Sequence, residues 1–197
     1  MYNSMARPLE GGATAETKGD DAALVQAAQD NPAEFAHIYA RYRHRVYAYL
    51  RVRLVNEEDA ADMTQHVFLH AFDALPRYRP RAVPLGAWLF RIARNAATDV
   101  QRRHRPTIPW ENVAYGPEPS SDQDVEAQVL QREAVDHLHA LLYSLDPDTR
   151  EVLLLRFAAR LTAAEIGVVI GKSHAATRQR LARALHSLKE RYDDESA

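Results

Sequence analysis

The sequence predicts an all-α protein of two small helical domains, joined by an acidic, proline-rich linker. Apolar residues recur at intervals of three and four along most of the chain, which is the period of an amphipathic helix. Sustained alternation at every second residue, which would indicate strands, is nearly missing. Charge also divides the chain, because a formal net charge of -2 conceals separate basic and acidic blocks.

The basic residues are concentrated in two blocks. Residues 35–105 hold 13 arginines against 6 acids, and residues 171–191 hold 6 basic side chains against 1 acid. Between these blocks, residues 106–150 hold 2 basic side chains against 9 acids. Two basic blocks separated by an acidic connection indicate two surfaces that face polyanions.

Composition excludes several classes of protein. No apolar run approaches the roughly 18 residues that a membrane span needs, so no membrane insertion is expected. Cysteine is absent, which excludes disulfides and thiolate metal sites and favours a cytoplasmic location. The sequence has no glycine-rich phosphate loop and no nucleophile motif, so we expect neither enzyme activity nor a cofactor.

Two segments are expected to lie outside the folded domains. Residues 1–30 are predicted to form a disordered tail, because their first part is rich in glycine, alanine, threonine and charge without periodicity. Residues 106–128 contain four prolines, two consecutive serines and five acids, a composition typical of a linker. Residues 31–105 and 129–193 remain as the two helical domains.

The first domain is expected to contain three helices. One begins at Asn31-Pro32, since proline suits the first turn of a helix. The second covers about residues 57–75. The third covers about residues 85–104 and follows a proline-broken loop that carries arginines.

The helix over residues 85–104 has a polar face opposite its apolar stripe. At about 100° per residue, this face gathers arginines, amides and a hydroxyl: Arg91, Arg94, Asn95, Thr98, Gln101, Arg102 and Arg105. Trp88 lies at the margin between the faces, and Tyr78 and Arg79 lie in the preceding loop. Such groups contact phosphates, base edges and unpaired bases. The alternative is a solvated basic face with Trp88 packed in the core.

The helix over residues 57–75 combines acidic and apolar side chains on its outer face. These are Asp59, Asp62, His66, His70 and Asp73, with Met63 and Leu69 among them. This mixture is typical of a docking surface for a partner helix with basic residues. Asp62, His66 and His70 also have the spacing of a metal-binding face. Three side chains on one exposed helix lack the supporting shell of a metal site, so none is expected.

Four helices are expected in the second domain. They cover about residues 129–144, a segment opening at Asp146-Pro147, a segment from the capping box at Thr162 to Gly171, and about residues 173–192. The last two indicate a helix-turn-helix unit. Its second helix directs Ala176, Gln179, Arg180, Arg183 and His186 outward, with Lys172 and Arg178 placed to contact phosphates. A generic helical hairpin is the alternative.

Three segments in this order resemble the sigma-70 family of bacterial RNA polymerase sigma factors. Residues 58–69 (EDAADMTQHVFL) are similar to the core of region two. Residues 87–95 (AWLFRIARN), with the arginine run that follows, resemble the segment that melts and reads the minus-ten element. Residues 161–167 (LTAAEIG) and 180–184 (RLARA) resemble region four, which reads the minus-thirty-five element. Only regions two and four are present, which matches the extracytoplasmic-function (ECF) group.

The resemblance implies a role for each surface. Core RNA polymerase would be bound by Asp59, Asp62, Met63, Gln65, His66, Leu69 and His70. The minus-ten element would be bound by Tyr78, Arg79, Trp88, Arg91, Arg94, Asn95, Thr98 and Arg102. The minus-thirty-five element would be bound by Lys172, Ala176, Arg178, Gln179, Arg180 and Arg183. The implied partners are core RNA polymerase, duplex and single-stranded promoter DNA, and an anti-sigma factor.

The sequence departs from the family pattern at both protein and DNA surfaces. His66 stands where glutamate is usual and His70 where a basic residue is common, so polymerase docking would vary with pH. Ala176 and Thr177 replace a more usual Thr-Val pair, which would remove one hydroxyl contact to DNA. The sequence thus predicts a promoter-specificity sigma factor. The alternative is a stand-alone helix-turn-helix regulator that does not bind polymerase, which would leave the acidic helix without a purpose.

Overall fold

The structure is a computed structural model, and it describes residues 15–54, 56–103 and 142–195. Within these ranges the chain forms helices and turns but no strand, so the predicted all-α class is confirmed. The elements are α1 (Ala15–Asp30), η1 (Pro32–Glu34), α2 (Phe35–Arg53), α3 (Glu57–Ala74), η2 (Leu75–Arg77), α4 (Leu85–Arg103), α6 (Pro147–Phe157), α7 (Ala163–Ile170) and α8 (His174–Glu195). The predicted linker and most of the predicted helix over residues 129–144 lie outside the described residues.

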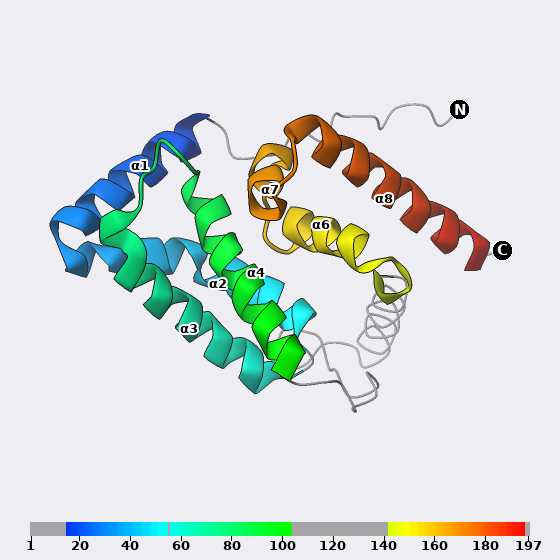
Figure 1. The fold of residues 1–197 in the computed structure, drawn as a ribbon, viewed down its shortest axis with the longest axis horizontal. Helices are drawn as coiled ribbons and strands as arrows, with labels where there is room; N and C mark the ends of the chain where they lie inside the picture. Colours follow the sequence, from blue (N-terminus) through cyan, green and yellow to red (C-terminus); the bar gives the residue numbers. More distant parts are fainter. Residues whose placement is uncertain (1–14, 55, 104–141, 196–197) are drawn as a thin grey trace, which may run out of the picture.

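The N-terminal domain consists of α1 to α4, and α2, α3 and α4 begin close to their predicted positions (Figure 1). Asn31 accepts a hydrogen bond from the backbone N–H of Ala33, ahead of the 3-10 turn that leads into α2. Asn56 accepts one from Glu58 at the start of α3. These side chains satisfy N–H groups that a helix start otherwise leaves unpaired.

The predicted disordered tail over residues 1–30 is wrong for its second half, because residues 15–30 form α1. Val25 and Ala28 on this helix are buried against the N-terminal core. Gln29 donates hydrogen bonds to the carbonyl oxygens of Leu75 (2.8 Å) and Tyr78 (3.0 Å). The buried face of α1 is narrow and made largely of small residues, so it produces little amphipathic signal. Residues 1–14 lie outside the described residues.

The C-terminal domain confirms the predicted starts of α6, α7 and α8 and the predicted turn at Gly171. Asp146 caps α6 by accepting a hydrogen bond from the backbone N–H of Thr149 at 3.0 Å, and hydrogen bonds from Thr149 lower the pKa of Asp146. The capping box is formed at α7, where the Glu165 carboxylate accepts hydrogen bonds from the backbone N–H and the hydroxyl of Thr162. Gly171 ends α7 with φ of 69°, a backbone conformation that favours glycine.

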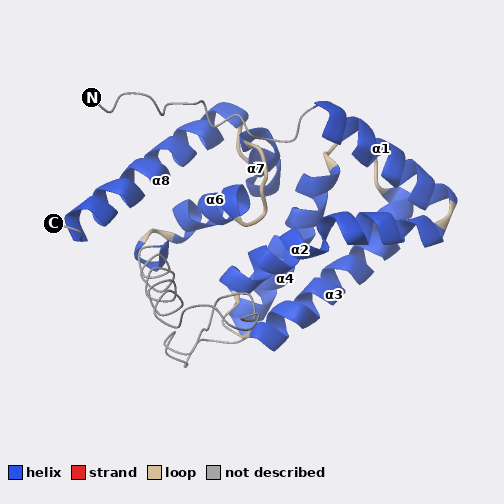
Figure 2. Cartoon of the chain, turned by 180° about the vertical axis from the view of Figure 1, so that it is seen from behind, coloured by secondary structure: helices blue, strands red, loops and turns tan. Residues whose placement is uncertain are grey.

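The two domains pack against each other and share one buried apolar cluster (Figures 1 and 2). α4 contacts α7, and α2 contacts α6. Leu161, in the turn before α7, is fully buried. Gly86 at the start of α4 lies so close to it that a Cβ atom there would be 3.3 Å from Leu161 Cδ2. The sequence predicted the two domains but not this contact.

The described helices include none that is both long enough and apolar enough to span a membrane.

We predict that Val25→Ala lowers the free energy of unfolding by about 2 kcal/mol, because it removes fully buried methyl groups from the core. Urea denaturation followed by circular dichroism measures this change. Gln26→Ala is the matched control, since Gln26 is an exposed neighbour on the same helix. Equal unfolding midpoints for Val25→Ala and the wild type would show that α1 is not part of the folded core.

We also predict that Gly167→Ala destabilises the C-terminal domain by about 1–3 kcal/mol. An added Cβ at this position would lie 2.7 Å from the backbone oxygen of Lys172, so the turn into α8 would have to shift. Gly171→Asn is the control, because nothing lies within 4 Å of its Cβ position and asparagine tolerates positive φ. Thermal denaturation should separate the two variants, and the same midpoint for both would contradict the steric argument.

Candidate nucleic-acid interface

The outer face of α3 combines exposed acidic, polar and apolar side chains, as predicted. Its opposite face is buried through Ala60, Thr64, Val67, Phe68 and Ala71. Of the residues predicted to bind polymerase, Asp62, Gln65, His66, Leu69 and His70 are exposed, whereas Asp59 and Met63 are half-buried. Leu69 projects from this face and is 65% exposed.

Asp62, His66 and His70 have the spacing of a metal-binding face, but the structure does not arrange them as a set of metal ligands. In the ranges that the structure describes, no group of three or more histidine, aspartate or glutamate side chains is arranged to hold a metal ion.

The loop between η2 and α4 is organised by two stacked aromatic rings. The rings of Tyr78 and Trp88 lie 4.5 Å apart with an interplanar angle of 29°. Tyr78 donates its hydroxyl hydrogen to the carbonyl oxygen of Val83, and burial raises the pKa of Tyr78. Tyr78 is only 6% exposed, so this structure leaves it no open face for a base. Trp88 is half-buried and Arg79 is exposed.

The basic face of α4 is divided between solvent and the C-terminal domain. Asn95 and Arg102 are exposed. Arg91 donates a hydrogen bond to the carbonyl oxygen of Val168 on α7 at 2.9 Å. Arg94 forms an ion pair with Glu151 on α6, with Nε and Oε1 3.4 Å apart. Two of the arginines predicted to contact DNA therefore bind the other domain in this structure.

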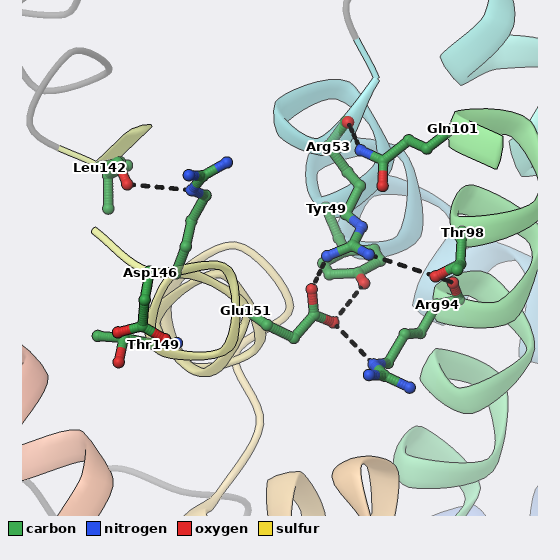
Figure 3. A network of polar contacts seen from close by, with 10 residues as sticks. Tyr49, Arg53, Arg94, Thr98, Gln101, Leu142, Asp146, Thr149 and Glu151 are labelled. Carbon is green, nitrogen blue, oxygen red and sulfur yellow. Dashed lines mark hydrogen bonds and ion pairs between the residues drawn. The ribbon is translucent and has the colours of Figure 1, made fainter. Parts of the chain in front are cut away.

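Glu151 is the centre of a polar network between the domains (Figure 3). It is 4% exposed and accepts a hydrogen bond from the Tyr49 hydroxyl at 2.7 Å. Arg53 donates to its second oxygen, Oε2, and also contacts the Thr98 hydroxyl. Burial raises the pKa of Tyr49 to about 12, so this hydroxyl keeps its proton and remains a donor.

The helix-turn-helix unit exposes most of the residues predicted to contact the minus-thirty-five element. Lys172, Ala176, Arg178, Gln179 and Arg183 are exposed. Arg180 is half-buried, with its guanidinium 3.1 Å from the Asp148 carboxylate on α6.

The neighbouring Thr177 belongs to the structure of the turn. It is 1% exposed, and its hydroxyl donates to the carbonyl oxygen of Ser173 at 2.9 Å. Thr177 therefore faces the core, and the predicted outward position of Ala176 is confirmed. The outward surface at this point therefore presents a methyl group.

Several residues that position these surfaces were not predicted from the sequence. Gln29 on α1 fixes the Tyr78 loop through two carbonyl oxygens. Arg45 donates to the carbonyl oxygen of Ala159 between α6 and α7. Glu151 directly precedes the apolar run at residues 152–155, but its burial and its partners depend on contacts with α2 and α4 that lie far away in the sequence.

Comparison with known proteins supports the division into two domains. The chain matches Sigma-70 region 2 over residues 38–107 and Sigma-70, region 4 over residues 141–190. It is 33% identical to the ECF RNA polymerase sigma factor ShbA of Streptomyces griseus, over 85% of this chain and 92% of the relative. It is 29% identical to the ECF RNA polymerase sigma factor SigD of Mycobacterium tuberculosis, over 86% of this chain and 82% of that relative.

The fold of this chain is also similar to that of a solved structure. The structure of CnrH in complex with the cytosolic domain of CnrY is similar with a TM-score of 0.66 and 26% identity, covering 88% of this chain and 97% of that chain. The surfaces on α3, α4 and α8 all lie within the two matched regions, whereas α1 precedes the first. The chain therefore belongs to the extracytoplasmic-function group of sigma-70 family RNA polymerase sigma factors.

Proposed function

We propose that this chain is a promoter-specificity factor that binds core RNA polymerase, recognises promoter DNA and directs the initiation of transcription. The observation that carries the proposal is the presence of three different surfaces on one chain of this family. α3 has an acidic and apolar face, α4 has a basic face with aromatic residues beside it, and α8 has a basic recognition face.

Polymerase docking is assigned to the outer face of α3. Asp62, Gln65, His66 and His70 are exposed there, around the projecting side chain of Leu69. A partner helix with basic residues could pair with the carboxylates and cover the leucine, and together these contacts give both specificity and apolar burial.

Minus-ten recognition is assigned to the basic face of α4 and the loop before it. Asn95 and Arg102 supply amide and guanidinium donors, and Arg79 and Trp88 lie at the edge of the same surface. Amide and guanidinium groups read base edges, and an indole ring can stack on an unpaired base. The firmly held Tyr78 supports the position of Trp88, with which it stacks.

Minus-thirty-five recognition is assigned to α8, where Gln179 and Arg183 would reach base edges in the major groove. Lys172 and Arg178 would bind phosphates on either side. This role needs no metal or cofactor, and we propose that the protein is not an enzyme. It acts in the cytoplasm, where core polymerase is found.

A stand-alone helix-turn-helix regulator is the less favoured function, because it leaves the exposed acidic and apolar face of α3 unused. An anti-sigma factor is a further partner that we propose. The related CnrH was solved with the cytosolic domain of CnrY, and a sigma factor RpoE was solved with the anti-sigma factor NepR from Bartonella quintana.

We predict that Asp62→Arg abolishes polymerase-dependent transcription by this factor. The substitution reverses an exposed charge on α3 and would repel a basic partner helix. Run-off transcription with core polymerase on genomic promoter fragments, together with a pull-down of core polymerase, measures the loss.

Asp30→Arg is the matched control for this experiment, because Asp30 is an exposed aspartate of the same domain at the end of α1. It should retain both activities. Full transcription by Asp62→Arg, or equal loss in the two variants, would contradict docking through α3. No core-dependent initiation by the wild type on any fragment would overturn the proposed function.

We predict different effects of substitutions at the base-reading and phosphate-binding positions of the C-terminal domain. Gln179→Ala should cost about 1–3 kcal/mol of binding at one base pair and relax the preference there. Lys172→Ala should weaken binding to all sequences alike, and it should reduce the slope of log binding constant against log salt concentration by about one. Binding of the reconstituted holoenzyme to duplexes enriched from a random pool measures both effects. A uniform loss for Gln179→Ala would rule out a base-reading role.

A further inference from the structure

The last turn of α1 makes a direct polar contact with the loop between η2 and α4. The side-chain amide of Gln29 donates hydrogen bonds to the carbonyl oxygens of Leu75 at 2.8 Å and of Tyr78 at 3.0 Å. A glutamine amide has two N–H donors, so the loop backbone uses both of them. The contact joins positions that lie 46 and 49 residues apart in the sequence. α1 therefore fixes the backbone of the loop where it leaves η2.

α1 is itself held firmly against the N-terminal domain. Val25 is fully buried in the core. On the same helix, Asp21 accepts a hydrogen bond from the Tyr42 hydroxyl at 2.7 Å and forms an ion pair with Arg41, with Oδ1 and Nε 3.2 Å apart. Both partners belong to α2. The Gln29 amide is thus presented to the loop from a helix with a fixed position.

Tyr78 connects this backbone contact to Trp88. Its carbonyl oxygen accepts from Gln29, while its ring stacks on the indole of Trp88 with the ring centroids 4.5 Å apart. The Tyr78 hydroxyl donates to the carbonyl oxygen of Val83, at the far end of the loop. Tyr78 is 6% exposed and Trp88 is half-buried. A displacement of the Tyr78 backbone would therefore move the ring on which Trp88 stacks.

The loop has the charge to attract a nucleic-acid strand of any sequence. Residues 74–98 contain five arginines and no acid, and Arg77, Arg79 and Arg81 are exposed. Attraction to phosphates is the same for every base, so it cannot by itself decide which base is accepted. Discrimination between bases needs groups that are already fixed in position before the base arrives. The backbone of the loop and the ring of Trp88 meet this requirement only while their supports hold.

We propose that Gln29 is a positioning residue for minus-ten recognition, because it holds the loop and Trp88 in the arrangement that accepts a preferred unpaired base. Gln29 acts through the loop, since both of its donors are already used by Leu75 and Tyr78. α1 thereby takes part in reading DNA, although it ends before the Sigma-70 region 2 match begins at residue 38. The inference rests on the proposed function for its assignment of this loop to unpaired bases.

The support of Trp88 is tested first, in the free protein. The chain has two tryptophans, so Trp110→Phe leaves Trp88 as the only one. In this background, Gln29→Met keeps the approximate length of the side chain but removes both donors. Loss of two hydrogen bonds should favour an open loop roughly tenfold. We expect acrylamide to quench the fluorescence of Trp88 more strongly, with a larger Stern–Volmer constant and emission at longer wavelength.

The matched control is Gln26→Met in the same background. Gln26 is an exposed glutamine of the same helix, and its amide contacts only Asp30 among the described residues, so quenching should not change. Gln29→Asn, whose amide is one carbon shorter, should change quenching in the same direction as Gln29→Met but by less. Circular dichroism checks that each protein remains helical. Unchanged quenching in both Gln29 variants, or an equal increase in Gln26→Met, would overturn the positioning role.

The effect on base choice is tested with holoenzyme reconstituted from core polymerase and the full chain. The probes are forked fragments with an upstream duplex and a single-stranded non-template tail of randomised sequence. Fragments enriched by the wild type define its preferred bases, and four fragments that differ at the most selective tail position are then compared. Gln29→Met should lose roughly fivefold or more of the preference at this position, which is the lower end of what stacking on one base contributes.

Val25→Ala is the control for general destabilisation of α1, because it weakens the core of the helix but leaves the Gln29 amide in place. It should lower the unfolding midpoint and keep the base preference of the wild type. Equal loss of preference in Val25→Ala and Gln29→Met would overturn the proposal. Stronger quenching of Trp88 without any loss of preference would overturn the role of Gln29 in base choice.

Failure of the proposed function gives a different result. A wild-type holoenzyme with no base preference in the single-stranded tail would overturn the minus-ten assignment and, with it, a role of Gln29 in base choice. A wild type that discriminates between bases, together with a Gln29→Met variant that discriminates equally well, would overturn only the inference about Gln29. The quenching measurement uses neither DNA nor polymerase.

Discussion

The arrangement of the two domains depends on how the buried Glu151 carboxylate is satisfied. A carboxylate with so little exposure needs donors close to it, because burial without them is costly. The donors that reach it come from α2 and α4. This requirement determines which face of α6 turns toward the N-terminal domain. Val152, Leu154 and Leu155, which follow Glu151, then join the apolar cluster that the two domains share, whereas Leu153 packs in a separate C-terminal cluster.

The same requirement gives the polar side of α4 contacts within the chain. Its apolar side, through Leu89, Phe90 and Ala93, is buried in the core and fixes the helix in place. Its polar side bears the arginines that suit nucleic acid, and some of these are the donors that the C-terminal domain needs. A guanidinium group binds carboxylates and phosphates with the same geometry. An arginine-rich helix face that suits nucleic acid can therefore also bind an acidic residue of its own chain.

The sequence predicted the helices well where their signals are local. The caps at Asn31, Asp146 and Thr162, and the end of α7 at Gly171, depend on residues within a few positions of each other. These elements are all confirmed. α1 was missed because its buried face consists of a few mostly small residues, whose burial depends on neighbours far along the chain. Helix periodicity cannot report such a contact.

The candidate surfaces were predicted for the same reason, since a helix face can be read from spacing alone. Their present accessibility could not be predicted. Nothing in the order of residues along α4 distinguishes Arg94, which binds Glu151, from Arg102, which is exposed. That difference arises only when a segment more than 50 residues later packs against the helix. Likewise, Tyr78 has an aromatic ring that could stack on a base, but Trp88 and the loop backbone bury it.

The position of α1 shows that the loop between η2 and α4 depends on more of the chain than the matched region. The Sigma-70 region 2 match begins at residue 38, after α1 has ended. Yet Gln29 on α1 binds carbonyl oxygens on both sides of the proline turn, and these hydrogen bonds orient the backbone that leads to Tyr78. Tyr78 in turn supports Trp88 by stacking. A base captured beside Trp88 would therefore meet a surface that is held in place partly by α1, from outside the matched region, and the rigidity of that surface would lower the entropy cost of binding an unpaired strand.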